Sequence, residues 1–279
     1  MSKVTCKILL LVIMAFSFSA NAFWFEIPNE NQTLSSLGRV EKLQRALNPD
    51  RIDVLVWNIY KGGLLSWRID LQRFAYGRDL ILLQEGILNN DMRDELDAST
   101  RHQFLFATSF VYKTSGHATG VVTGATAIPS QTDYLRSDGR ELIGFSPKMT
   151  LVTKYPLRGM DKELMVINIH ELNSVSWKKM AAQIIPALRQ AAEHDGPVLF
   201  AGDFNTWSKK KEAFVMRAME RSGFKPIELA NPQDRMHVFG RALDYIFVRG
   251  LKARNGKVLV EALGSDHKPL SAILSVIRD

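Results

Sequence analysis

Cysteine is almost absent from this chain of 279 residues, and the only one is Cys6. Removal of the N-terminal segment that contains it would leave a mature chain without cysteine. That excludes disulfide bonds even in a compartment that permits them, so stability must come from a large buried core, which a chain of this length can build. Because no histidines and cysteines are grouped at ligand spacing, the sequence also excludes a structural zinc site.

Acidic residues are missing from the first 22 positions, where Lys3 and Lys7 precede an apolar run at 8–16. Small and polar residues follow the run, and an A-x-A pattern ends at Ala22. This is the layout of a secretory signal peptide, and the run is too short to span a bilayer comfortably. We expect residues 1–22 to be the signal peptide, with cleavage after Ala22 and a periplasmic or secreted mature protein. An uncleaved signal anchor is the alternative.

A stretch rich in proline, glycine and serine that would separate two domains is also lacking. We therefore expect an N-terminal arm over residues 23–50 and one domain over 51–279. Loss of Lys3 and Lys7 on cleavage would lower the formal charge from +7 to +5. This mild basic excess is compatible with a phosphate-bearing polymer or an anionic lipid surface as partner. We expect a monomer without a membrane span after cleavage.

The chain does contain many short apolar stretches, several of them separated by helical patterns. Apolar runs predict strands at 52–58, 80–85, 164–170, 197–203, 243–248, 258–262 and 269–275, with further strands between 104 and 157. Helical spacing predicts helices at 64–76, 91–100, 174–194 and 208–222. Because strands this apolar are buried on both faces, we expect two β-sheets packed face to face with helices outside.

Polar side chains stand at the ends of five of these strands and in a loop before the last one. They are Asn58, Glu85, His170, Asp203 with Asn205, Asp244, and Ser265-Asp266-His267. Strand ends are where ligands bind in α/β cores, and burying so many unpaired charges without a ligand would be costly. Carboxylate and amide oxygens are the ligands that Mg²⁺ prefers. Singly, each could cap a loop or form a turn, but together they predict a metal-assisted active site.

Six short motifs around these residues occur in the order found in the endonuclease/exonuclease/phosphatase superfamily, which this chain resembles over residues 52–275. They are Val56-Trp57-Asn58, Leu83-Gln84-Glu85, Asn168-Ile169-His170, Gly202-Asp203-Phe204-Asn205, Leu243-Asp244-Tyr245-Ile246 and Ser265-Asp266-His267. That group includes deoxyribonuclease I-like nucleases, neutral sphingomyelinases and inositol-polyphosphate phosphatases. Segments 55–61 and 201–207 are most similar to an uncharacterised bacterial subgroup. The resemblance implies a four-layer α/β sandwich, with two packed mixed β-sheets flanked by helices and the site at one end.

The resemblance also implies a division of labour among these residues. Glu85 would be the principal Mg²⁺ ligand, with Asn58 and Asp266 assisting and Mn²⁺ as a possible substitute. Asp203 would orient or deprotonate the attacking water, and Asn205 would hold the phosphate or the nucleophile. His170 and His267 would donate to phosphoryl or leaving oxygens, and Asp244 and Asp266 would orient the histidines or the metal. Elementary chemistry supports these roles, because Mg²⁺ and imidazolium neutralise the anionic phosphodiester while a carboxylate takes the proton.

Two departures narrow the substrate class. The DNA-repair endonucleases of this superfamily carry an Asp two residues after the Asn, where this chain has Tyr60, and a Tyr where it has His170. Both differences, together with the predicted signal peptide, argue against abasic-site repair. His170 is typical of the deoxyribonuclease I-like, sphingomyelinase-like and phosphatase branches. The predicted reaction is therefore phosphodiester hydrolysis with an open choice of leaving group.

Among substrates, nucleic acid cut without sequence preference is favoured over a phospholipid headgroup. Basic side chains expected near the site would contact phosphates without reading bases; they are Lys61, Arg140, Lys148, Lys209 and Lys210. The same charges would suit an anionic membrane, which Phe204 or Trp207 could touch, but no long apolar loop stands between 104 and 160. The alternatives are a phospholipid or inositol-phosphate phosphoesterase and, outside the enzymes, a non-catalytic binding protein on the same scaffold.

Overall fold

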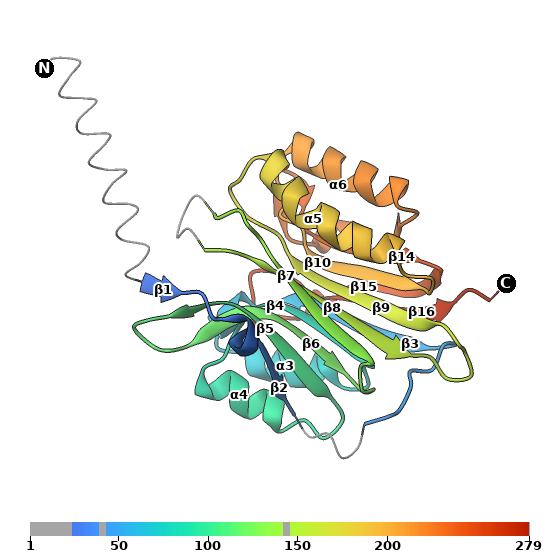
Figure 1. The fold of residues 1–279 in the computed structure, drawn as a ribbon, viewed down its shortest axis with the longest axis horizontal. Coiled ribbons are helices and arrows are strands. Elements are labelled where there is room, and N and C mark those ends of the chain that lie inside the picture. Colours follow the sequence, from blue (N-terminus) through green and yellow to red (C-terminus); the bar gives the residue numbers. More distant parts are fainter. Residues whose placement is uncertain (1–23, 39–42, 142–145, 279) are drawn as a thin grey trace, which may run out of the picture.

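A computed structural model of the chain describes residues 24–38, 43–141 and 146–278. The predicted signal peptide lies outside the described residues. Two mixed β-sheets pack face to face, and helices cover the outer face of each (Figure 1). This arrangement confirms the predicted four-layer α/β sandwich. Within the described part of the chain, no helix is both long and apolar enough to span a bilayer.

The first sheet has eight strands among the described residues, and β3 and β4 are its one parallel pair there. In spatial order its strands are β1 (Phe25–Glu26), β5 (Gln103–Tyr112), β6 (Ala118–Ala125), β4 (Leu80–Ile87), β3 (Ile52–Asn58), β16 (Leu270–Val276) and β15 (Leu251–Val258), with β2 (Leu34–Leu37) paired to β5. The short strands β1 and β2 both pair with β5. Part of the segment expected to form an arm therefore belongs to the sheet.

The second sheet has six strands in the described residues, with β9 and β10 as its parallel pair. In spatial order they are β11 (Lys225–Pro226), β14 (Asp244–Arg249), β10 (Val198–Asp203), β9 (Glu163–His170), β8 (Met149–Pro156) and β7 (Gln131–Arg136). A small separate hairpin joins β12 (His237–Val238) to β13 (Arg241–Ala242) just before β14 begins.

Helices lie on both outer faces of the sandwich (Figure 1). Those longer than one turn are α3 (Trp67–Ala75) and α4 (Asn90–Asp97) on the first sheet, and α5 (Trp177–Ala192) and α6 (Lys209–Arg221) on the second. The shorter ones are α2 (Glu30–Thr33), η2 (Tyr60–Gly62) and η3 (Pro232–Asp234). Asn89 caps α4 and Ser208 caps α6, each accepting a hydrogen bond from a backbone N–H of the first turn.

The apolar core is divided into layers by the two sheets. Between the sheets, side chains such as Val56 and Val166 belong to one buried cluster. A second cluster joins α3 and α4 to the outer face of the first sheet, and a third joins α5 and α6 to the second sheet, where Phe200 packs. Burial of both faces explains why these strands are almost continuously apolar up to their last residue.

Strand pairing brings the polar strand ends to one edge of the sandwich. His170 and Asp203 are register partners at the ends of the parallel strands β9 and β10. β14 runs antiparallel to β10 and begins at Asp244, directly opposite Asp203. On the first sheet, Asn58 at the end of β3 pairs with Gln84, next to Glu85. These ends meet at the left-hand edge of the sandwich in Figure 1.

The prediction of a strand at 258–262 is wrong. β15 occupies Leu251–Val258, and a turn at 260–261 follows it. β15 is an edge strand whose Lys252, Arg254 and Lys257 are exposed, so it lacks the apolar run of a buried strand. Of the apolar residues just after it, Leu259 and Ala262 are buried for a different reason, because they pack in the layer that contains α3, whereas Val260 is exposed.

Candidate active site

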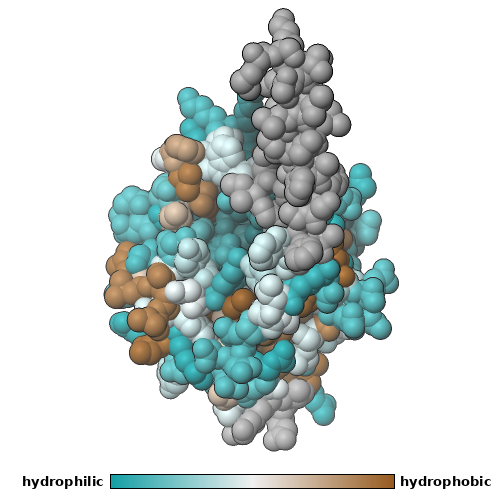
Figure 2. Space-filling model, turned by 90° about the vertical axis from the view of Figure 1, so that its left-hand side faces the viewer, coloured by the Kyte–Doolittle hydropathy of each residue, from teal (hydrophilic) through white to brown (hydrophobic). Residues whose placement is uncertain are grey.

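A cavity of about 410 Å³ opens where the strand ends meet. Seven of the eight predicted site residues line it, namely Asn58, Glu85, His170, Asp203, Asn205, Asp266 and His267. The eighth, Asp244, contacts the cavity-lining His267. Figure 2 shows the face of the molecule onto which this edge opens, with hydrophilic side chains over much of it. The structure thus brings together residues that six separate segments of the sequence supply.

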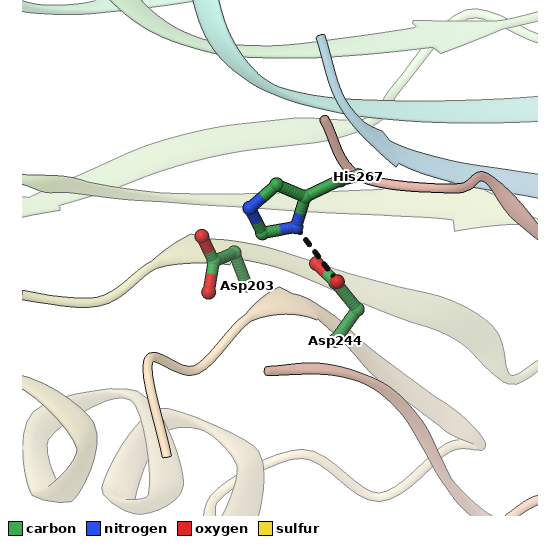
Figure 3. A group of neighbouring side chains, drawn as sticks. All are labelled: Asp203, Asp244 and His267. Carbon is green, nitrogen blue, oxygen red and sulfur yellow. Dashed lines mark hydrogen bonds and ion pairs between the residues drawn. The ribbon is translucent and has the colours of Figure 1, made fainter. Parts of the chain in front are cut away.

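His267 points toward two carboxylates, those of Asp203 and Asp244 (Figure 3). Its Nδ1 lies 2.8 Å from Asp244 Oδ2. All three side chains are buried, and their candidate ligand atoms lie within 4.8 Å of one another. Burial alone would lower the pKa of His267, but the charge and hydrogen bond of Asp244 outweigh it and raise the pKa to about 10. His267 is therefore a buried imidazolium at neutral pH.

Asp203 is held by two N–H donors. The side-chain amide of Asn58 donates to Asp203 Oδ2 at 2.9 Å, and the backbone N–H of Asn205 donates to Oδ1 at 2.9 Å. Burial raises the pKa of Asp203 to about 7, with His267 opposing that rise and Asp244 adding to it. The carboxylate is thus fixed in place and has a proton affinity suited to exchange with water at neutral pH.

The loop that carries Asp266 and His267 is tied to the end of β3. Ser265 Oγ donates to the backbone oxygen of Asn58 at 2.6 Å, and Trp57 Nε1 donates to the backbone oxygen of His267 at 2.9 Å. Trp57 therefore packs in the core and also fixes the histidine loop. Asp266 itself is exposed and lines the cavity.

Glu85 reaches the cavity through a local break in β4. Its φ is 55°, a left-handed value that is uncommon for a residue other than glycine. The pairing of β4 with β6 shifts register between Leu83 and Gly86, which is the mark of a bulge. Bulges beside active sites re-aim a side chain, and here the Glu85 carboxylate, 21% exposed, lies 3.6 Å from His170 Nε2.

His170 differs from His267 in its electrostatic surroundings. Its Nε2 lies 3.6 Å from Glu85 and 3.7 Å from Asp203. Burial, followed by the positive charges of Lys148, His267 and Lys61, lowers the pKa of His170 well below its usual value. Its backbone oxygen accepts a hydrogen bond from Gln183 of α5 at 2.8 Å. The site therefore pairs one cationic with one neutral imidazole.

Some residues around the site were missed by the sequence analysis. Glu171 is fully buried beside His170, and burial raises its pKa well above the usual value. Its backbone oxygen accepts from Asn205 Nδ2 at 2.8 Å. Lys211, 1% exposed, donates to the backbone oxygens of Leu172 and Asn205 at 3.4 Å each. A charged residue directly after a site histidine was the available signal for Glu171, whereas nothing distinguished Lys211 from its two lysine neighbours.

Two groups of side chains have the chemistry to hold a divalent cation. The predicted set of Asn58, Glu85 and Asp266 shares the cavity and offers amide and carboxylate oxygens. In the buried set around His267, the imidazolium already supplies the positive charge that Asp203 and Asp244 need. A hard cation that prefers oxygen ligands therefore fits the set of Asn58, Glu85 and Asp266 better, with Glu85 as the central ligand.

The side chains considered for substrate contact have different surroundings. Phe204 is fully buried in the core, so the suggestion that it could touch lipid is wrong. Trp207 is half-buried, with the Lys211 ammonium 4.8 Å from its ring centroid. Of the basic residues, Lys61 and Lys148 line the cavity, Arg140 is half-buried, and Lys209 and Lys210 are exposed at the start of α6.

Comparison with known proteins finds relatives of the sequence and of the fold. The sequence model of the Endonuclease/Exonuclease/phosphatase family matches residues 55–267. A UPF0294 protein of Klebsiella pneumoniae (strain 342) is 37% identical over 223 residues, which is 79% of this chain and 81% of that protein. The human Nocturnin catalytic domain with bound sulfate superposes with a TM-score of 0.59 and 17% identity, over 83% of this chain and 96% of that one. A mannosyl-6-phosphatase of Bacteroides thetaiotaomicron VPI-5482 gives 0.59 and 14%, over 80% and 99%.

Proposed function

Because this chain belongs to the endonuclease/exonuclease/phosphatase family, we propose that it is a metal-dependent phosphodiesterase in which water attacks the phosphorus in line, with nucleic acid as substrate. The observation that carries the proposal is the setting of Asp203. A buried carboxylate is held by Asn58 and Asn205 at a cavity that it shares with a protonated histidine. That arrangement provides a base and an acid a few ångströms apart.

Asp203 acts as the base in this proposal. Its two hydrogen bonds leave further lone pairs on the carboxylate for a water molecule. A pKa of about 7, caused first by burial, lets the ionised form take a proton near neutral pH. Asn58 and Asn205 keep the oxygens aimed, so the geometry is set before substrate binds.

His267 acts as the positive donor. Its Nδ1 is committed to Asp244, which leaves Nε2 to donate to a phosphoryl or leaving oxygen. The raised pKa keeps it charged during the reaction, where negative charge accumulates on the phosphate. His170 is neutral and can donate one hydrogen bond without adding charge.

Glu85, Asn58 and Asp266 would hold the metal, which we propose to be Mg²⁺ with Mn²⁺ as a substitute. When bound, such a cation neutralises phosphate charge and polarises the phosphorus–oxygen bond. Lys61 and Lys148, which line the same cavity, add positive charge toward the phosphate. The bulge at Glu85 is the structural feature that aims its carboxylate at this position.

Nucleic acid is our first choice of substrate because the cavity is open and carries cationic side chains. Exposed Lys209 and Lys210 extend the positive charge beyond the cavity along the start of α6. Contacts of this kind bind successive phosphates of a polymer without reading its bases. A nuclease of this type loses affinity steeply as salt rises, because counterions are released on binding.

A phospholipid is the second candidate, and a patch of exposed apolar side chains favours it. Leu65, Ile69 and Leu263 are 103%, 69% and 68% exposed. The backbone of Gly264 packs against Ser66 and Trp67, so the segments that carry the patch are neighbours. The patch lies near the active site in sequence, because Asp266 follows Leu263 by three residues.

The test is a substrate panel with the mature chain, residues 23–279, and Mg²⁺. Plasmid DNA, RNA, sphingomyelin vesicles and a phosphoinositide are compared at two salt concentrations, with EDTA controls. We expect plasmid and RNA cleavage that EDTA abolishes and that high salt weakens. Turnover of a lipid with plasmid left intact would replace the nuclease by the lipid candidate. Metal-dependent thermal stabilisation without turnover of any substrate would favour a binding protein.

A further inference from the structure

A second cavity, of about 240 Å³, adjoins the catalytic cavity. The two share five lining residues, Lys61, Glu85, Glu141, Lys148 and His170. We call the second cavity the annex. Because the shared residues include the proposed metal ligand and both cavity lysines, a phosphate bound at Glu85 would have the annex directly beside it.

Part of the annex lining that the catalytic cavity does not share is aromatic. Phe25, Phe110 and Tyr112 belong to it. The rings of Phe25 and Phe110 are 4.9 Å apart between centroids, and those of Phe110 and Tyr112 are 5.1 Å apart and nearly perpendicular. The first pair is tilted at 50° and the second is edge-to-face, so the three rings pack against one another as one wall.

The aromatic wall depends on the N-terminal strand β1. Phe25 is the register partner of Tyr112, and the backbone oxygen of Trp24 accepts a hydrogen bond from the N–H of Lys113 at 3.0 Å. These contacts add a strand to the outer edge of β5. The first described residues of the chain thus supply one side of a cavity that adjoins the catalytic centre.

The boundary between the two cavities is polar, with two lysines and two glutamates among its shared lining residues. Lys61 Nζ lies 3.1 Å from the hydroxyl of Tyr112 and 5.8 Å from the centroid of its ring. Lys148 Nζ lies 3.4 Å from Glu141. Beyond this boundary, buried Val121 and Met149 line the annex together with the hydroxyl-bearing side chains of Ser109, Thr119 and Ser146. A ligand that spans both cavities would therefore carry its phosphate at the catalytic end, beside Lys61, Lys148 and the proposed metal, and an uncharged group at the annex end.

We propose that the annex is a subsite for a nucleobase carried by the nucleotide next to the scissile phosphate. The proposal rests on the phosphodiesterase function above and adds what the enzyme recognises beyond the phosphate. The annex is smaller than the roughly 300–1,000 Å³ of sites for drug-sized ligands, which suits one ring system rather than a long acyl chain. Aromatic walls bind any base by its face, so the subsite would favour nucleotides without selecting a sequence.

The test compares diesters that share one leaving group. Thymidine 5′-(p-nitrophenyl phosphate), methyl p-nitrophenyl phosphate and hexyl p-nitrophenyl phosphate are assayed with Mg²⁺ for kcat/KM. Their Kd values are measured with the Asp203→Asn variant, so that recognition is scored even without turnover. We expect the thymidine ester to be favoured over the methyl ester by about ten-fold in both measurements. Phe25→Ala and Phe25→Leu should each reduce this ratio to near one in both measurements.

The control is Tyr76→Ala, which removes an exposed aromatic ring that lines neither cavity. It should keep the preference for thymidine. Equal Kd values for the thymidine and methyl esters, or a greater preference for the hexyl ester, would overturn the nucleobase subsite. Metal-dependent turnover without a preference for the thymidine ester would support the phosphodiesterase function but not the nucleobase subsite. If no ester were hydrolysed but the thymidine ester still had the lower Kd, the result would count against the phosphodiesterase function only.

Discussion

At the scale of single residues, the two buried site histidines differ in charge because their carboxylate partners and neighbouring cations differ. His267 lies 2.8 Å from Asp244, close enough for a charge-assisted hydrogen bond. His170 lies 3.6 Å from its nearest carboxylate, that of Glu85, and burial, followed by three cations, lowers its pKa and opposes its protonation. Two imidazoles in one cavity therefore carry different charges, and only His267 can balance charge that develops on a phosphate.

Asp244 is predicted to act entirely through His267. Asp244→Asn removes the charge that keeps the imidazole protonated but leaves the cavity lining unaltered. We expect kcat to fall by about 10²-fold, as when one transition-state donor is lost, with a much smaller change in KM. Steady-state kinetics with Mg²⁺ and a simple diester measure both constants, and near-UV circular dichroism checks the fold.

The matched control for this variant is Asp195→Asn. Asp195 is an exposed aspartate, also paired to a cation, in the loop that precedes β10 rather than at its catalytic end. Its substitution should leave kcat unaltered. An Asp244→Asn enzyme with the wild-type kcat would show that the protonation of His267 plays no part in the reaction.

At the scale of elements, the site depends on how closely β9 and β10 approach. Gly202, next to Asp203, has a φ of 142°, and a Cβ there would meet the backbone oxygen of Ile169 at 2.0 Å. Gly202→Ala should push the strands apart, cost about 1–3 kcal/mol of unfolding free energy and separate Asp203 from His170. Chemical denaturation measures the free energy of unfolding and steady-state kinetics measure kcat. Both quantities should fall.

Gly159→Ala provides the comparison for this variant. Gly159 also has a positive φ, 71°, but among the described residues no atom would contact an added Cβ within 4 Å. It should lose some stability, about 1 kcal/mol from the backbone alone, while keeping its activity. If both variants kept the same kcat, close approach of β9 and β10 would not be a requirement of the site.

Element by element, the sequence was most informative where strands are buried on both faces. β3, β4, β9 and β10 are largely apolar and carry a polar residue at or near the end of the apolar run, so the strands and these polar positions could be predicted. β15 was misplaced because an edge strand carries no such pattern. Strands β1 and β2, of two and four residues, are too short for any periodic signal.

Features that depend on packing between distant segments could not be predicted. Lys211 is buried because its ammonium reaches the backbone oxygens of Leu172 and Asn205, a contact that exists only once α6 is in place. Phe25 lines the annex because β1 pairs with β5, far along the chain. Neither residue differs in sequence context from an ordinary surface lysine or a loop phenylalanine.

At the scale of the whole molecule, the proposed cleavage site lies shortly before the strand that supplies Phe25 to the annex. We propose that the chain is exported and cleaved after Ala22, so that the mature protein begins at Phe23, just before β1. N-terminal sequencing of the protein purified from its native host should give Phe23 as the first residue. A chain that retains Met1 or Ser2 and is recovered from the cytosol would contradict the proposed export.

The measurement that tests the central claim most directly is the rate of hydrolysis of bis(p-nitrophenyl) phosphate by the wild-type chain and by Asp203→Asn. With Mg²⁺, the wild-type chain should turn the diester over, and EDTA should abolish the reaction. Asp203→Asn should lower kcat by about 10²–10⁴-fold, the contribution expected of a general base, with the fold retained. Full activity in Asp203→Asn would contradict the mechanism proposed for this site.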